Sequence, residues 1–502
     1  MLPGSQTPEK KAGLAYWAQR VLEECDKASA GFAADPVHDL RVAIRRCRSM
    51  ADGFLSVDPD PVWKQMKRLA KPLFSSLGEL RDTQVMLEWV AKLAEPGDPV
   101  AESLTAELTR KESELKLAAQ QSLASFDRKH WMSLNAHLAK RTGRVPLDGP
   151  VFQHVALERW TDARALHRQA LKNRSAFAYH QLRIGIKRFR YTVENFLPER
   201  HAKWSKDLRD LQDALGEVHD LDVLRVILRF HTDVSAEDRV RWQRHIAEER
   251  RQRLELYRQK MLGKQSLWNI WRADLPSGGD LERAGIEKLR TWAAFLDPDR
   301  THSALVTRFA LELYDGVTQC GTLKFSPEHR RWLEAAGILH EIGRSKAEDH
   351  HDGRHQRRGF RKVCKLKAPL GWTAEEMRCV AVLVRYHRGV LPRATDSWFV
   401  GLGAKRRAEL MPLIGILRLA NAFDESHEHL VSDLRVASQN ENVVVVAKGL
   451  EEFSPLAQRV ARARYLLESV CKCAIVVRPL RTETIIPPAR IRRRSQTAAA
   501  AR

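Results

Sequence analysis

The protein has 502 residues, and its 85 lysines and arginines outnumber its 63 aspartates and glutamates, which gives a formal net charge of +22. A chain of this length exceeds one hydrophobic core, and an apolar fraction of 43% is enough to fill several, so the composition excludes a mainly disordered protein. The basic excess indicates a polyanionic partner, and it does not choose between nucleic acid, a phosphate polymer and an anionic membrane surface.

The sequence lacks the signals of membrane and secreted proteins. No apolar run approaches the roughly 20 residues that span a bilayer. Residues 1–11 contain no apolar signal region, so we expect a cytoplasmic protein. Seven scattered cysteines are typical of reduced thiols in that compartment. Cys471 and Cys473 lie in a stretch typical of a strand, and without a second pair a structural role is favoured over metal binding.

The first part of the chain is duplicated. Residues 38–48 (HDLRVAIRRCR) match residues 180–190 (HQLRIGIKRFR) at a histidine, a leucine, an isoleucine and three arginines. A second landmark follows each at nearly the same spacing, in residues 77–87 (LGELRDTQVML) and 215–225 (LGEVHDLDVLR). Two matched pairs in the same order predict a duplicated domain. We expect it to span residues 1–274, with halves at about 8–145 and 150–274.

Both copies show helical periodicity. In the first copy an apolar stripe begins at Val37, Leu40 and Ile44, and a basic stripe displaced around the helix begins at His38 and Arg41. The second copy repeats this division. Proline and glycine are sparse inside these stretches and gather between them. The pattern predicts long antiparallel helices joined by short turns.

The basic stripe is a candidate binding surface. Cations on one helical face repel each other unless solvent or an anion compensates them. A solvated surface explains one such stripe, but its duplication favours a site for an extended, repeating polyanion, because arginine and lysine bind phosphate oxygens well. Aromatic side chains that stack on bases are largely missing from the stripe, which favours an anion without bases. Among these cations, His38 and His180 should resist protonation, and a bound polyanion should reverse this effect.

The paired motifs resemble those of the CHAD family, the conserved-histidine α-helical domains, over about residues 14 to 274. The resemblance implies two four-helix halves related by a pseudo-twofold axis, with a basic central surface that binds inorganic polyphosphate. It also implies that Asp82 and Asp220 orient basic side chains or cap helices. The implied polyphosphate-binding residues are His38, Arg41, Arg45, Arg46, Arg48, Arg68, Lys71, His180, Arg183, Lys187, Arg188, Arg190, Lys206 and Arg209.

The remainder of the chain divides into shorter regions. The stretch LPSGGD begins the clearest linker, which we place at residues 275–281. A second helical region is expected over residues 282–430. The segment of residues 431–480 has the pattern of a hairpin across Gln439 and Asn440, a helix and a further strand, which predicts a small α/β appendage. Residues 481–502 form a basic tail that we expect to be disordered.

The second helical region carries histidines in a suggestive order, followed by RLANAFD at residues 418–424. Together they resemble the HD superfamily, in which two histidines and two aspartates hold a divalent metal that activates water. They resemble more closely the C-terminal domains of the exopolyphosphatase and guanosine-pentaphosphatase family, over about residues 282 to 479. The residues that carry the resemblance are His302, His340, Glu341, His350, His351, His355 and His387.

Two positions depart from the catalytic pattern. Glu341 stands where the His-Asp pair has its aspartate, and Asn421 stands where the last ligand is usually an aspartate. The neutral carbonyl of an asparagine weakens a site for a dication, although Asp424 lies one turn on and could substitute. No counterpart of the actin-like catalytic domain of the exopolyphosphatases is present. We therefore favour a non-catalytic HD-like module, with no catalytic residue assigned and with a divalent metal as a candidate cofactor held by His302, His340, Glu341 and Asp424.

The leading hypothesis is a polyphosphate-binding protein, located in the cytoplasm and associated with polyphosphate or storage granules. The alternative is a metal-dependent phosphohydrolase that acts on polyphosphate or on phosphorylated nucleotides through the HD-like domain. A third hypothesis, nucleic-acid binding through the stripe, residues 239–253 and the basic tail, ranks last because Glu248 and Glu249 interrupt that segment and favour a solvated helix.

Overall fold

The computed structural model describes residues 13–323, 326–344, 354–393 and 395–480. The chain divides into two compact units, residues 1–288 and 289–502. It is mainly α-helical, with a duplicated antiparallel helical bundle followed by a helical domain and a small α/β appendage, so the predicted fold class is confirmed. In the described part of the chain, no helix combines the length and the apolar character needed to cross a bilayer. The basic tail lies outside the described residues.

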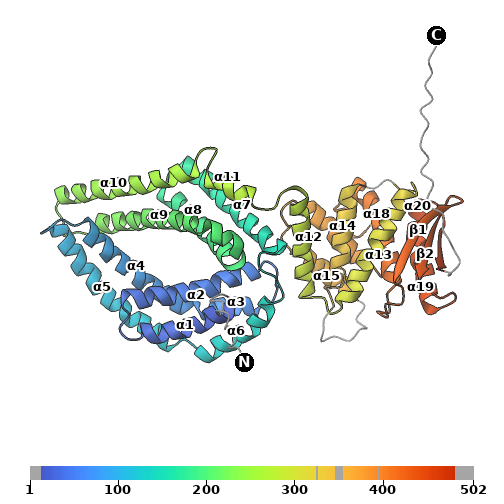
Figure 1. The fold of residues 1–502 in the computed structure, drawn as a ribbon, viewed down its shortest axis with the longest axis horizontal. Helices are drawn as coiled ribbons and strands as arrows, with labels where there is room; N and C mark the ends of the chain where they lie inside the picture. Colours follow the sequence, from blue (N-terminus) through green and yellow to red (C-terminus); the bar gives the residue numbers. More distant parts are fainter. Residues whose placement is uncertain (1–12, 324–325, 345–353, 394, 481–502) are drawn as a thin grey trace, which may run out of the picture. The chain divides into compact units, whose positions relative to one another are not determined.

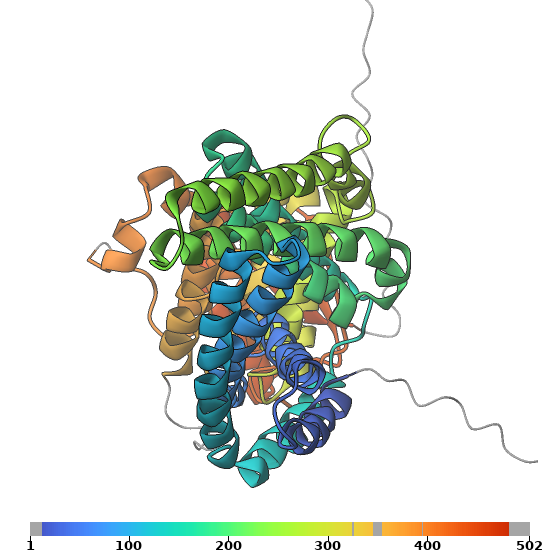
Figure 2. The same ribbon diagram turned by 90° about the vertical axis from the view of Figure 1, so that its left-hand side faces the viewer.

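The first unit is built from two runs of antiparallel helices (Figure 1). Helices α2 and α8 carry the repeated histidine motif, and they pack against each other where the two halves meet. Helices α4 and α5 lie side by side, as do α9 and α10 (Figures 1 and 2). The helices are α1 (Leu14–Ala28), α2 (Ala34–Phe54), α3 (Val62–Leu69), α4 (Lys71–Leu93), α5 (Pro99–Ala124), α6 (Arg128–Thr142), α7 (Pro150–Asn173), α8 (Ala176–Phe196), α9 (Pro198–Phe230), α10 (Ala236–Met261) and α11 (Leu267–Ala273).

The apolar stripes of the two motif helices form part of the core of this unit. Leu40 and Ile44 of α2 and Leu182 and Ile186 of α8 are fully buried, which confirms the predicted periodicity. Burying a side chain of this kind stabilises the fold by about 1.5–3 kcal/mol. Because this stripe faces the core, the basic stripe on the same helices is held at the junction of the two halves.

The halves differ at one helix. In the first half α3 ends before Ala70 and α4 begins at Lys71, whereas the corresponding stretch of the second half is the single helix α9. Pro72 lies in the first turn of α4 and has no backbone N–H to continue the hydrogen bonds of α3. Its counterpart by the LGE landmark is Asp210, which leaves α9 unbroken.

The second unit begins within α12 (Gly278–Ala294). The expected linker is therefore shorter in the structure, because α12 starts at Gly278 rather than after residue 281. Helices α13, α14, α16 and α18 pack together in this unit (Figure 1). The remaining helices before the sheet are α13 (Arg300–Gln319), α14 (Pro327–Leu339), α15 (His355–Cys364), α16 (Ala374–Tyr386), α17 (Ser397–Val400) and α18 (Ala404–Ala422).

A three-stranded sheet of order β1-β2-β3 forms the appendage. Strands β1 (Asp433–Gln439) and β2 (Asn442–Lys448) form the expected antiparallel hairpin, whose turn residues Asn440 and Glu441 both have positive φ, as a tight two-residue turn requires. Strand β3 (Ile475–Pro479) pairs with β2 in parallel, so the chain crosses over between them. The crossover consists of α19 (Pro455–Ala463) and α20 (Tyr465–Cys471).

Candidate anion-binding groove and candidate metal centre

Two adjoining cavities lie where the halves of the first unit meet, each with a volume of about 460 Å³. Arg45 of α2 and Lys187 of α8 line both cavities, so the cavities meet at these two side chains. We call the two cavities together the basic groove. His38, Arg81, Lys92 and Arg183 line its first part, and Arg48, Lys67, Arg159 and Arg188 line its second part.

Aromatic rings support the arginines of α2. Phe74 of α4 lies under the guanidinium groups of both Arg41 and Arg48, at 5.2 and 5.0 Å from the ring centroid. Arg48 also donates a hydrogen bond of 2.8 Å to the carbonyl of Lys67. Arg45 lies over the ring of Tyr191 at 5.6 Å. These cation–π contacts orient the guanidinium groups, and the aromatic residues that make them were missed by the sequence analysis because they lie outside the stripe.

Carboxylates also line the basic groove, and Arg81 pairs with Glu88 and Lys67 with Asp52. The cations at its centre have no such partner among the described residues. Burial and the positive charges of Arg183 and Arg45 together lower the pKa of Lys187 to about 7, and Asp220 opposes this effect. Burial also lowers the pKa of Arg183, whose Nε–H is buried without a hydrogen-bond partner. Among the described residues, no carboxylate oxygen lies within 4.0 Å of the charged nitrogens of Arg45, Arg183 or Lys187. Cations held in this way favour a bound anion.

The histidines behave as the sequence predicts. Burial, and then the neighbouring arginines, lower the pKa of both His38 and His180, so both resist protonation. A further histidine, His219, lies with its Nδ1 3.2 Å from the Nδ1 of His180, and burial lowers its pKa to about 4. The sequence analysis missed His219. The repeat could have identified it, because His219 occupies the position in the second landmark that the basic residue Arg81 occupies in the first half.

The structure places the implied polyphosphate-binding residues unequally. Arg46 pairs with Glu194 and lies over the ring of Trp17, and the Nε of Arg190 is 3.8 Å from the same glutamate. These two arginines therefore share a carboxylate. Those that line the basic groove are His38, Arg45, Arg48, Arg183, Lys187 and Arg188, and those that line neither cavity are Arg41, Arg46, Arg68, Lys71, His180, Arg190, Lys206 and Arg209.

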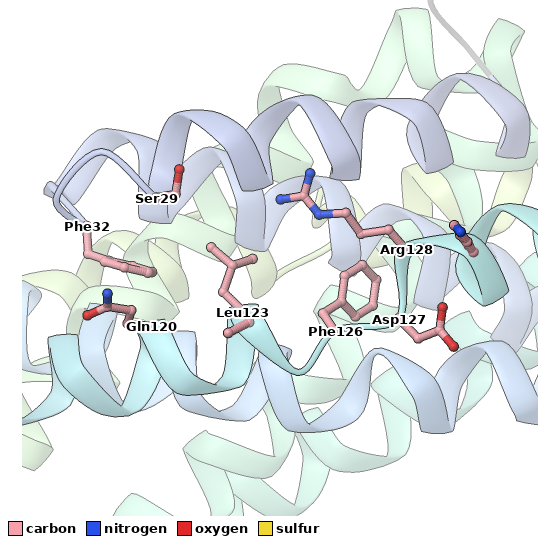
Figure 3. A pocket seen from close by; sticks show the side chains of 9 residues that line it. Ser29, Phe32, Gln120, Leu123, Phe126, Asp127 and Arg128 are labelled. Carbon is pink, nitrogen blue, oxygen red and sulfur yellow. The ribbon is translucent and has the colours of Figure 1, made fainter.

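A third cavity of the first unit has a different character. It has a volume of about 550 Å³ and lies between the turn after α1 and the connection from α5 to α6 (Figure 3). Phe32 and Leu123 line it with polar neighbours. Its arginine, Arg128, donates a hydrogen bond of 2.6 Å to Asp26. Since this guanidinium already has a carboxylate partner, the cavity lacks the charge imbalance of the basic groove.

The second unit buries a cluster of four histidines around one carboxylate, which we call the histidine–glutamate cluster. Its side chains are less than 6% exposed, and they are those of His302, His340, Glu341, His355 and His387. The Oε1 atom of Glu341 lies 3.1 Å from the Nε2 of His355 and 3.7 Å from the Nε2 atoms of His340 and His387. The ligand atoms form two groups, His302 with His340 and Glu341, and Glu341 with His355 and His387.

Hydrogen bonds from the Nδ1 atoms, on the side of each imidazole that faces away from Glu341, orient three of the histidine rings of the cluster. The Nδ1–H of His340 donates to the carbonyl of Gly337 at 2.7 Å, and that of His387 donates to the carbonyl of Val384 at 2.8 Å. His302 donates from Nδ1 to Asp424 at 2.8 Å. With the Nδ1 protons engaged, the Nε2 atoms of the neutral rings present lone pairs to the interior, which is how histidines bind metals. Burial lowers the pKa of His340 to about 4 and keeps this ring neutral.

Local backbone geometry assembles the histidine–glutamate cluster. His340 and His387 lie at the ends of α14 and α16, and His355 opens α15. Gly343 allows the first turn of α15 to approach, because a Cβ atom there would lie only 1.9 Å from the carbonyl oxygen of His355. The conformation therefore requires glycine two residues after Glu341.

A divalent metal fits the histidine–glutamate cluster, since imidazole nitrogens and one carboxylate converge there. Three of the four candidate ligands, His302, His340 and Glu341, lie together. Asp424 lies outside both groups and accepts the proton of His302 instead. The sequence analysis did not assign His355 and His387 as ligands, although it had already noted both among the histidines whose order in the chain carries the family resemblance. Asn421 belongs to neither group, and His350 and His351 lie outside the described residues.

Comparisons with known proteins agree with this division. Residues 14–229 match the model of the CHAD domain family, and residues 286–456 match that of the family described as Ppx/GppA phosphatase, domain III. The crystal structure of the CHAD domain from the plant Ricinus communis is similar to this chain at 22% identity, covering 49% of this chain and 88% of that one, with a TM-score of 0.40. No curated protein matches the chain. Both resemblances stated from the sequence are confirmed.

Proposed function

We propose, for a chain that carries a CHAD domain in its first unit and a Ppx/GppA domain III in its second, that it binds inorganic polyphosphate along the basic groove. The observation that carries this proposal is the set of half-buried cations at the centre of the groove, where Arg45, Arg183 and Lys187 have no carboxylate partner within 4.0 Å among the described residues. A linear phosphate chain supplies closely spaced negative charge along its length. It would compensate these cations in both parts of the groove.

The groove favours polyphosphate over a nucleic acid. Its aromatic residues are already covered by cations, since Lys92 and Arg253 lie over Trp89, and Arg45 lies over Tyr191. Bases would find no free ring on which to stack there. The groove therefore offers positive charges to the phosphates of a polymer and no stacking surface to bases, which suits a polyanion that has phosphates and no bases.

The test compares polyphosphate with single-stranded DNA of matched charge over a series of salt concentrations. We expect tighter binding of polyphosphate, and we expect the double variant Arg45→Glu/Lys187→Glu to lose at least about 100-fold in affinity, because two attractive contacts become repulsive. Arg128→Glu, which reverses the charge of a paired arginine in the third cavity, is a control for charge reversal outside the groove and should bind normally. Equal affinities for the two polymers, or an unchanged double variant, would contradict the proposal.

A second candidate function is metal-dependent hydrolysis of phosphoanhydride bonds in the second unit. The converging Nε2 lone pairs of His302 and His340 and the buried carboxylate of Glu341 favour it, since they would hold a divalent ion. Such an ion, when bound, lowers the pKa of a coordinated water. Arg344 lies against the Oε2 of Glu341 and places a positive charge beside the cluster.

Hydrolysis is tested by measuring orthophosphate released from polyphosphate after the protein is loaded with Mn²⁺ or Mg²⁺. We expect release that falls at least about 100-fold in His340→Gln, because that variant removes a ligand while the ring's place in the core is kept by a side chain of similar size. Equal release by the variant, or no release by the loaded wild-type protein, would exclude this candidate and leave polyphosphate binding untouched.

A further inference from the structure

We propose that Ser103 is a nucleophile activated by His231 and Glu107, and that it accepts an acyl group from activated esters. The three side chains lie in the first unit, and none of them lines the basic groove. The Nε2 atom of His231 lies 2.8 Å from the Oγ of Ser103, and its Nδ1 lies 2.7 Å from the Oε2 of Glu107. This is the order of contacts in a serine–histidine–carboxylate triad. Acylation of this serine would depend neither on polyphosphate binding nor on the metal centre.

The three residues come from two helices that the fold brings together. Ser103 and Glu107 lie one turn apart on α5, so both can face the same neighbour. Leu104 of α5 and Leu228 of α9 are buried in one apolar cluster, which holds α5 beside the end of α9, where His231 lies. Because α5 belongs to the first half and α9 to the second, the arrangement exists only in the folded unit.

The backbone of His231 is fixed on both sides. Its N–H donates to the carbonyl of Ile227 at 3.0 Å, and its carbonyl accepts a hydrogen bond of 2.7 Å from Arg239. Arg239 also donates to the carbonyl of Arg229 at 3.1 Å. His231 is buried, with 8% of its surface exposed. A ring held in this way keeps both nitrogens directed at their partners.

Glu107 determines which nitrogen of the neutral ring carries the proton. An ionised carboxylate only accepts hydrogen bonds, so the Nδ1 of His231 bears the proton and its Nε2 presents a lone pair to Ser103. The hydroxyl of Ser103 then donates to that lone pair. Ser113, on the same helix, instead donates to the backbone carbonyl of Thr109 at 3.1 Å. A base for the hydroxyl proton therefore distinguishes Ser103 from Ser113.

The chemical step transfers one acyl group. The Oγ of Ser103 attacks the carbonyl carbon of the ester and forms a bond to it, while the hydroxyl proton passes to the Nε2 of His231. The bond from that carbon to the alcohol oxygen breaks, and the departing alcohol takes the proton from Nε2. Glu107 stays ionised and compensates the charge of the transient imidazolium. Since Ser103 is only half-buried, a small ester reaches it from solvent.

The experiment treats the full-length protein with p-nitrophenyl acetate at about pH 8, above the ordinary pKa of an imidazole, and maps acetylated serines by mass spectrometry. Trypsin cleaves after Arg110 and Lys111, so Ser103 and Ser113 fall in different peptides. We expect Ser103 to be acetylated at least about 100-fold faster than Ser113, as general-base catalysis provides. Because Ser113 is exposed on the same helix, it is an internal control that needs no substitution. Equal rates at the two serines would overturn the proposal.

Two substitutions separate the roles of the base and the carboxylate. His231→Gln removes the base and should lower the acetylation rate of Ser103 to that of Ser113. Glu107→Gln should lower it by at least about tenfold, because the amide can donate to Nδ1 and leave the ring proton on Nε2. Nitrogen-15 spectra of histidine-labelled protein check this positioning role, since the His231 ring should carry its proton on Nδ1 in the wild-type protein and on Nε2 in Glu107→Gln. An unchanged rate in either variant, or the same tautomer in both proteins, would contradict the assigned roles.

Discussion

Lys187 shows how one side chain can make polyanion binding depend on pH. Burial, Arg183 and Arg45 disfavour its charged form in the free protein and lower its pKa to about 7. A bound phosphate chain would favour the charged form and raise the pKa again. Above the free-state pKa, binding must therefore take up a proton, whereas well below it the lysine is charged before and after binding. Affinity is highest at low pH and falls as the pH rises through about 7.

We accordingly expect polyphosphate affinity to decrease between about pH 7 and pH 9, by at most about tenfold per pH unit for one proton. Lys187→Arg should flatten this dependence, because a guanidinium stays charged over the whole range. Calorimetry in buffers of different ionisation enthalpy would measure the proton uptake directly.

Asp220 also faces Lys187 and titrates at a nearby pH, whereas His180 and His219, which interact with Lys187 too, have their pKa values lowered by burial. Burial raises the pKa of Asp220 to about 6, and Arg183 opposes that shift. Its ionisation also weakens anion binding as the pH rises, but at a pKa of about 6 roughly nine tenths of it is over by pH 7, so most of the change above pH 7 belongs to the lysine. An affinity that rises from pH 7 to pH 9 in the wild-type protein, or a variant with the same slope, would contradict the role of Lys187.

At the scale of helices, local patterns predicted most of the architecture. The apolar stripe that begins at Leu40 and Ile44 is buried in α2, and the same stripe in α8 repeats it, because a helical period of 3.6 residues is legible from one sequence. The hairpin was predicted across Gln439 and Asn440, and the structure places its turn one residue on, at Asn440 and Glu441. The start of α12 was not predicted, since a glycine pair usually marks a break and here opens a helix.

The candidate sites were only partly legible, because they depend on contacts between helices. Arg46 belongs to the polyphosphate-binding set that the resemblance implies, but its partner Glu194 is 148 residues away along the chain, and no local pattern predicts that pair. Similarly, Asp424 looked like a metal ligand from its position one turn after Asn421, and the structure places it against the Nδ1 of His302 instead. Sequence spacing identifies the face of a helix, and packing decides which side chains on that face remain without a partner.

At the scale of the whole molecule, the net charge of +22 divides into compensated and uncompensated parts. Helix α10 is rich in arginine, but several of its arginines have carboxylate partners. Arg250 pairs with Asp222 at 2.9 Å, Arg251 with Glu248 at 2.6 Å and Arg253 with Glu217 at 2.7 Å. This helix is a solvated, ion-paired face, in contrast to the centre of the basic groove. The density of basic residues alone would not have distinguished these two surfaces as candidate anion-binding sites.

This contrast predicts where counterions are released on binding. A cation that contacts a polyanion contributes about one unit to the dependence of the logarithm of affinity on the logarithm of salt concentration. We expect Arg45→Gln/Lys187→Gln, measured at about pH 6 where Lys187 is charged, to reduce that slope by about two. Arg244→Gln/Arg251→Gln removes the same charge from the exposed face of α10, where Arg251 already pairs with Glu248, and should leave the slope unchanged. If the α10 variant instead loses as much slope as the groove variant, the polymer binds across the charged surface in general, and the uncompensated cations of the groove are not its site.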